Sequence, residues 1–135
     1  EKLAQGYAEI PLENTPDLAP ICMAVAAVTH GARYTGTARL RYKESDRAAV
    51  MAQELAKFGV TVTVRDKDIS VDSSGFHSPD VPLSSHGDHR IAMALSFLLT
   101  KTGGVLCGAE SVAKSYPGYF DALRTLGARM RRDKH

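Results

Sequence analysis

Charged side chains gather at four places where an apolar, helix-like run begins. Each place carries groups suited to binding anions or to moving protons. Cations at a helix start oppose the helix dipole, which favours anions there, so a bound anion would remove the conflict and use the free backbone N–H groups. If these helix starts converge, they form a cleft for a small, multiply anionic substrate that undergoes acid–base chemistry. The groups are Asp17; Lys43, Glu44 and Arg47; His89 and Arg90; and Lys114.

Each of these groups also has a purely structural interpretation. Asp17 and Asp88 are plausible helix caps, and residues 43–47 alone are typical of a solvated first turn capped by Ser45 or Asp46. Because several such groups occur together in one chain, we favour the functional interpretation.

The composition is that of a globular domain. The 135 residues are 44% hydrophobic and 24% charged, which is ordinary for such proteins, and the longest apolar run, residues 21–28, is too short for a membrane span. A net charge of +2, without a basic face and stacking aromatics, argues against nucleic acid. His86 and His89 lack a third ligand nearby. We therefore expect no membrane, no nucleic acid and no metal.

Apolar periodicity and turn residues predict an α/β chain. Residues 73–87, rich in Ser, Gly, Pro and His, are expected to be mostly loop. The predicted helices span residues 17–30, 45–58, 88–101 and 117–126. The predicted strands span residues 32–38, 60–65, 69–72, 81–83 and 105–107, and a last one begins near 129.

The order of these elements repeats. Asp17 opens a predicted helix in the first half, and Asp88 opens the corresponding helix in the second. We expect one full βαβαββ unit at 7–72 and most of a second at 81–130. Repeat folds need a full set of units to close their core, so the incomplete second unit indicates a piece of a larger protein.

Four segments resemble signatures of the EPSP synthase family, in order and over essentially the whole chain. Residues 40–47, Leu-Arg-Tyr-Lys-Glu-Ser-Asp-Arg, are similar to the family's Leu-Arg-Val-Lys-Glu-Ser-Asp-Arg. Residues 88–94 resemble its Asp-His-Arg-(Met/Ile)-Ala-Met segment, and residues 114–120 its Lys-(Ser/Thr)-(Phe/Tyr)-Pro-x-(Tyr/Phe)-Phe segment. Pro16 and Asp17 are similar to its Pro-Asp turn.

The resemblance implies a fold and a reaction. The fold is a two-domain inside-out α/β barrel of repeated βαβαββ units, of which this chain would be part of the C-terminal domain. The family transfers the enolpyruvyl group of phosphoenolpyruvate to the 5-hydroxyl of shikimate 3-phosphate and releases phosphate through a tetrahedral intermediate. This step belongs to chorismate and aromatic amino acid biosynthesis.

The resemblance also implies the setting of the reaction. The substrates are small molecules, no cofactor is needed, and the enzyme is cytoplasmic and a monomer when full length. An N-terminal domain of the same chain, with further substrate-binding motifs, would be missing here. We expect the fragment alone to be inactive.

Residue by residue, the resemblance implies catalytic roles for Asp17, Glu44, Lys114 and His89. Asp17 would be a base at the 5-hydroxyl, and Glu44 a proton donor or relay near the methylene carbon. His89 would assist nearby. Which of Asp17, Glu44 and Lys114 is the dominant acid or base stays open, because their pKa values depend on the closed cleft.

The same comparison implies substrate-binding roles. Asp17 and Lys43 would contact shikimate 3-phosphate. Arg47, Arg90 and Lys114 would hold the carboxylate and phosphate of phosphoenolpyruvate, for which Arg forks and a Lys charge are suited.

Two other interpretations stay open. The sister enolpyruvyl transferase that acts on UDP-N-acetylglucosamine shares the repeat fold, but it lacks the combined Lys-Glu-Ser-Asp-Arg and Asp-His-Arg segments. A non-catalytic, anion-binding fragment would bind phosphoenolpyruvate without turnover.

Overall fold

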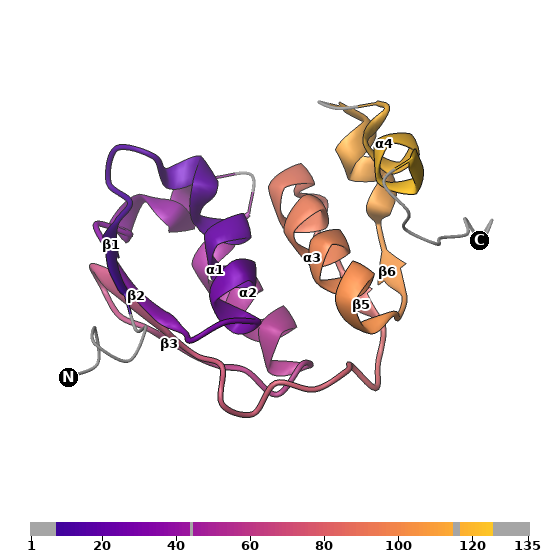
Figure 1. Cartoon of the computed structure of the whole chain (residues 1–135). Coiled ribbons are helices and arrows are strands. Elements are labelled where there is room, and N and C mark those ends of the chain that lie inside the picture. The colour runs from indigo at the N-terminus through magenta and orange to yellow at the C-terminus, as the bar shows by residue number, and fades with distance from the viewer. Residues whose placement is uncertain (1–7, 44, 115–116, 126–135) are drawn as a thin grey trace.

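The computed structural model describes residues 8–43, 45–114 and 117–125 (Figure 1). Its elements run in the order β1 (Ala8–Pro11), α1 (Ala19–Ala27), β2 (Ala32–Thr35), α2 (Arg47–Ala56), β3 (Thr61–Val64) and β4 (Asp68–Asp72). The order then restarts with β5 (Leu83–Ser84), α3 (His89–Thr102), β6 (Leu106–Cys107) and α4 (Tyr119–Thr125). Short 3-10 helices are η2 (Pro16–Leu18), η3 (Ala38–Tyr42) and η4 (Ala109–Lys114). The predicted α/β class is confirmed.

Within the described residues, β1, β2, β4 and β3 form one sheet in that order. β1 and β2 pair in parallel, with Ala8 opposite Ala32, so a crossover helix, α1, must connect them. β4 runs antiparallel to β2 and β3. The turn between β3 and β4 is closed by the Arg65 N–H, which donates to the Asp68 carbonyl at 2.9 Å. This hairpin is formed by two strands that the sequence predicted, at 60–65 and 69–72.

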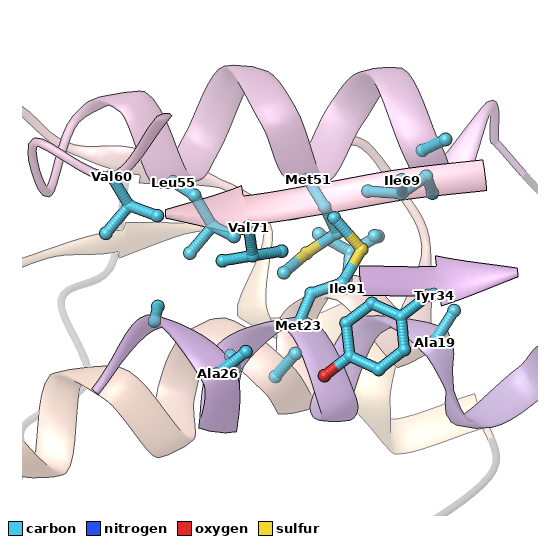
Figure 2. Close-up of a cluster of buried hydrophobic side chains, with 14 of the residues drawn as sticks. Ala19, Met23, Ala26, Tyr34, Met51, Leu55, Val60, Ile69, Val71 and Ile91 are labelled. Atoms are coloured by element: carbon cyan, nitrogen blue, oxygen red, sulfur yellow. The ribbon is translucent and has the colours of Figure 1, made fainter. Parts of the chain in front are cut away.

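The helices form layers beside this sheet. α1 and α2 lie between the sheet and α3, and α1 packs directly on α3 (Figure 1). Met23 of α1, Met51 of α2 and Ile91 of α3 are all fully buried and lie close together in the core (Figure 2). One core therefore joins the first βαβαββ unit to the first helix of the next.

The strand predicted at 32–38 was too long. β2 ends at Thr35, and Gly36 has a φ of 69°, a conformation that favours glycine. A Cβ placed at Gly36 would lie 2.6 Å from the Cβ of Glu13, so this close approach also excludes a side chain. The chain then forms η3, not strand, and η3 leads to the Lys43–Arg47 segment.

Other predicted boundaries shift by a few residues. The helix predicted at 17–30 begins as η2, and α1 itself covers only Ala19–Ala27. The helix predicted at 45–58 is also shorter, and the one predicted at 117–126 begins two residues later, at Tyr119. The strand expected near 129 lies outside the described residues. Among the described residues, no helix is long and apolar enough to cross a bilayer.

The shared core predicts how single truncations affect stability. Leu55 is fully buried, so Leu55→Ala should lower the free energy of unfolding by about 2–5 kcal/mol, because it removes buried methyl groups and leaves a cavity. Leu18 is 46% exposed, and Leu18→Ala, the matched control, should cost less than about 1 kcal/mol. Urea denaturation of the variants measures both values. Equal losses would contradict this description of the core.

Candidate active site

The side chain of Arg47 lies at the centre of the candidate site, although the residue is only 1% exposed. Its Nε donates to Oδ2 of Asp88 at 2.8 Å, and its Nη2 donates to Oδ1 of Asp88 at 3.1 Å. This is the two-pronged pairing that holds a guanidinium in one plane. Its Nη1 donates to Oδ1 of Asp17 at 2.8 Å. One cation thus joins the starts of three helices: η2, α2 and α3.

Asp88 is both a helix cap and a partner of the central cation. It is fully buried, and its Oδ1 accepts the backbone N–H of Arg90 at 3.0 Å, which caps α3. Its Oδ2 also accepts the hydroxyl of Ser45 at 2.7 Å. Burial would raise the pKa of the Asp88 carboxyl, but the hydrogen bonds from Arg47 and Ser45 outweigh burial and lower it below its usual range. Asp88 is therefore held ionised.

Asp17 forms the solvent-facing side of this arrangement. Its carboxylate binds Arg47, and Nζ of Lys43 lies 3.8 Å from the same oxygen, Oδ1. Its side chain is 54% exposed, whereas that of Lys43 is 29% exposed. A ligand in solution can therefore reach a carboxylate that is already placed between two cations.

Arg90 is oriented by the Asp88 cap and carries an unsatisfied donor. Its Nε is buried and has no hydrogen-bond partner within the described part of the chain. A buried donor without a partner costs on the order of 1–3 kcal/mol. A bound anion would supply the missing acceptor, which makes Arg90 the residue of this site that most clearly indicates a ligand.

The structure brings together part of the site predicted from the sequence. Asp17 contacts both Lys43 and Arg47, and Asp88, the other partner of Arg47, accepts the backbone N–H of Arg90. His89 is the first residue of α3 and is half-buried.

The two remaining predicted residues are only partly covered by the structure. Glu44 lies outside the described residues. Lys114 is described only as the last residue of η4, an element that packs on α3. The side-chain geometry proposed for these two residues therefore stays a prediction.

Two residues of the site were interpreted from the sequence as caps only. Asp88 caps α3 as expected, but it also binds Arg47, and Ser45 does not cap α2. The cap of α2 is Asp46, whose carboxylate accepts the Ala49 N–H at 3.2 Å. The sequence signal for the pairing of Asp88 is Arg47 itself, because a cation at the start of an apolar helix requires a carboxylate partner if it is buried.

The donor set of the site suits anions. Arg47 and Arg90 supply guanidinium groups and Lys43 an ammonium group. Among the described residues, no cluster of three His, Cys, Asp or Glu side chains is arranged to hold a metal ion. With Asp17 as a reachable carboxylate, the site can bind a polyanion and accept a proton.

Comparison with known proteins supports a specific family. A family model described as EPSP synthase (3-phosphoshikimate 1-carboxyvinyltransferase) matches residues 4–123. The 3-phosphoshikimate 1-carboxyvinyltransferase of Aeropyrum pernix is 38% identical over 125 residues, which are 90% of this chain and 29% of the relative. That of Korarchaeum cryptofilum is 41% identical over 126 residues, which are 91% of this chain and 30% of the relative.

The structural comparison agrees with the sequence comparison. A solved structure of EPSP synthase from Acinetobacter baumannii superposes with a TM-score of 0.76 at 32% identity, and the match covers 86% of this chain and 28% of that one. The fold of repeated βαβαββ units, which the resemblance implied, is therefore confirmed. The chain spans a little under one third of the length of the relatives it matches.

The pairing of Asp88 predicts a pH-dependent loss of stability. At pH 7, Asp88→Asn should lower the free energy of unfolding by on the order of 3 kcal/mol, because part of the charge that neutralises buried Arg47 is removed. The pKa of Asp88 is lowered in the folded state. Its contribution is therefore complete above the unfolded pKa of about 3.9 and is lost as the pH falls through the lower folded pKa.

Urea denaturation at pH 7 and at acid pH measures this effect. The gap between wild type and Asp88→Asn should narrow as the pH falls below about 4. Asp121, whose side chain is 83% exposed and pairs with Arg124 on the surface, offers the control. Asp121→Asn should change stability by less than about 1 kcal/mol at either pH, and an effect as large as that of Asp88→Asn would contradict the prediction.

Proposed function

Because the chain belongs to the EPSP synthase family, we propose that the complete protein transfers the enolpyruvyl group of phosphoenolpyruvate to the 5-hydroxyl of shikimate 3-phosphate. The observation that carries this proposal is the convergence of Asp17, Lys43, Arg47 and Arg90 at neighbouring helix starts. Both substrates are polyanions. The described part of the site offers two cations, Lys43 and Arg47, against the reachable carboxylate of Asp17, and Arg90 follows Asp88, the other partner of Arg47.

The cations would bind and orient phosphoenolpyruvate. Arg90, whose Nε lacks a partner among the described residues, would donate to its carboxylate or phosphate, together with Lys114. Arg47 is preset by Asp88, so an arriving anion would meet a guanidinium that is already fixed. Such preorganisation lowers the entropy cost of bringing the reactants together.

The acid and base groups would move two protons. Asp17, with Lys43 beside it, would bind shikimate 3-phosphate and take the proton of the 5-hydroxyl as its oxygen attacks phosphoenolpyruvate. Glu44 would donate or relay the proton that the methylene carbon gains, and His89 would assist. Phosphate would then leave the tetrahedral intermediate as the methyl carbon loses a proton and the vinyl group reforms. Each placed group of this kind typically contributes ~10²–10⁴-fold.

We also propose the setting of the reaction. The chain would be part of the C-terminal domain, with repeat units at 7–72 and 81–130, and an N-terminal domain of the same protein would complete the site. The complete enzyme would be a cytoplasmic monomer of chorismate and aromatic amino acid biosynthesis. No residue of the proposed mechanism requires a cofactor.

Phosphate release from phosphoenolpyruvate tests this function in the complete parent protein. Shikimate 3-phosphate and UDP-N-acetylglucosamine are offered as separate acceptors, and we expect release only with the former. Glu44→Gln and Lys114→Ala should each lower kcat about 10²–10⁴-fold, because each removes a group that transfers a proton or stabilises charge.

The control is Glu110→Gln on the exposed side of η4, which should keep wild-type activity. Release only with UDP-N-acetylglucosamine would overturn the proposed acceptor. Release with neither acceptor would overturn the proposed reaction.

The 135-residue chain alone should release no phosphate from the same two substrates. Its cations are present, but the substrate-binding motifs of the proposed N-terminal domain are not, so the reactants cannot be enclosed and aligned. The same phosphate assay at high chain concentration measures this. Turnover by the isolated chain above the no-enzyme rate would refute the prediction.

A further inference from the structure

The segment from Ser84 to Arg90 is held by α2 at two places. Arg47 at the start of α2 binds Asp88. Glu54 follows Arg47 by seven residues on the same helix, and two helical turns bring it to the same face. Glu54 is fully buried, and it contacts the other end of the segment. α2 thus uses a buried cation and a buried anion to hold the chain that leads into α3.

The contacts of Glu54 are made to the segment and to α2. Its Oε1 accepts the Ser84 N–H at 2.9 Å, and its Oε2 lies 2.9 Å from Nε2 of His86. Nζ of Lys57 donates to both oxygens, at 2.9 and 3.1 Å, and also to the Pro82 carbonyl at 3.0 Å. These donors satisfy the hydrogen-bonding capacity of the buried carboxylate. They also connect Glu54 to Ser84 and His86 directly, and to Pro82 through Lys57, all shortly before Asp88 in the chain.

These donors keep Glu54 charged in spite of its burial. Burial would raise the pKa of the Glu54 carboxyl, but the hydrogen bonds from His86, Lys57 and the Ser84 amide outweigh it and lower the pKa. A carboxylate only accepts hydrogen bonds, so Nε2 of His86 carries the proton in this contact.

The turn that Glu54 holds is strained. His86 has a φ of 54° and Gly87 a φ of 73°, and the left-handed conformation is uncommon for a residue other than glycine. Such a conformation persists only where the surroundings determine it. The contact of the His86 ring with Glu54 supplies this constraint at the residue that needs it. Asp88, two residues after His86, accepts hydrogen bonds from Arg47 and caps α3.

We propose that Glu54 is a positioning residue for phosphoenolpyruvate binding. It is not proposed to touch substrate. It fixes the turn so that Asp88 meets Arg47 and caps α3, whose second residue is Arg90. β6 holds the segment from the other side, since the Ser85 N–H donates to the Cys107 carbonyl at 3.0 Å and the Ser85 hydroxyl to the Gly108 carbonyl at 2.7 Å. Toward α2, the Arg47–Asp88 contact fixes one end of the segment, and Glu54 fixes the other. The proposal rests on the function proposed above.

The proposal has a selective consequence. Asp17 and Lys43, the proposed ligands of shikimate 3-phosphate, lie on η2 and just after η3, outside the segment. Arg90, a proposed ligand of phosphoenolpyruvate, lies on it. Loss of Glu54 should therefore raise the KM for phosphoenolpyruvate far more than the KM for shikimate 3-phosphate. A general loss of stability would instead reduce the amount of active enzyme and would not change one KM more than the other.

Steady-state kinetics of Glu54→Gln in the complete parent protein test this. Glutamine has the same size and still accepts the Ser84 N–H, but it loses the charge that binds His86 and Lys57. The KM for phosphoenolpyruvate should rise at least ~10-fold, since a displacement of about 1 Å can cost ~10²-fold, and the KM for shikimate 3-phosphate should stay unchanged. Glu110→Gln is the matched control. An equal rise in both KM values, or a loss in kcat alone, would overturn the proposal.

A second variant avoids the risk that a buried substitution prevents folding. The His86 side chain is 30% exposed, and asparagine tolerates a positive φ but is too short to reach Glu54. His86→Asn should raise the KM for phosphoenolpyruvate selectively, by a smaller factor than Glu54→Gln. The control is His77→Asn, in an exposed loop where Nδ1 of His77 lies 2.7 Å from the neighbouring Ser78 carbonyl. Unchanged kinetics of His86→Asn would count against the proposal.

Amide hydrogen exchange separates failure of this inference from failure of the proposed function. If the wild-type parent protein releases no phosphate with shikimate 3-phosphate, the proposed function is wrong, and the role of Glu54 is decided by exchange alone. Amides of residues 84–90 should then exchange faster in Glu54→Gln than in wild type, while those of β3 and β4 keep their rates. Unchanged exchange at 84–90 would overturn the positioning role.

Discussion

A guanidinium group removed from water must find its counter-charges inside the protein, and the candidate site is organised around this requirement. Arg47 is buried at the start of α2, where the helix dipole does not favour a cation. Asp88 and Asp17 neutralise it from two other helix starts. Because removal of either carboxylate would leave a buried charge without full compensation, these contacts fix how η2, α2 and α3 meet, and the placement of Arg90 follows from them.

The two carboxylates around Arg47 have different environments and can therefore have different uses. Asp88 is fully buried and saturated by Arg47, Ser45 and the Arg90 N–H, so it suits a fixed, structural charge. Asp17 shares the same cation but is largely exposed, so it can exchange a protein contact for a substrate contact. The site thus combines a rigid inner carboxylate with a reachable outer one.

Sequence patterns predicted the α/β class, the helix starts and part of the site, because these depend on local periodicity and on charges next to apolar runs. The early end of β2 was not predicted, since it depends on the close approach of Gly36 to Glu13 from a distant turn. The partnership of Arg47 with Asp88 and the burial of Glu54 were also missed. The local sequence at position 88 also fits a residue that is a helix cap alone, and that of α2 also fits a Glu54 that faces solvent. Only the packing of α2 beside the segment from Ser84 to Arg90 shows that Asp88 also binds Arg47 and that Glu54 is buried.

The burial of Ile91 beside Met23 and Met51 (Figure 2) bears on the order in which the chain folds. The first βαβαββ unit supplies two of these side chains, but the third comes from the helix that follows it. During synthesis, the core cannot close when β4 leaves the ribosome, because Ile91 of α3 is made later. A contact between residues far apart in sequence cannot form before the second residue has been made. The first βαβαββ unit and α3 are therefore expected to fold as one cooperative block, although the sequence pattern divides them between β4 and β5.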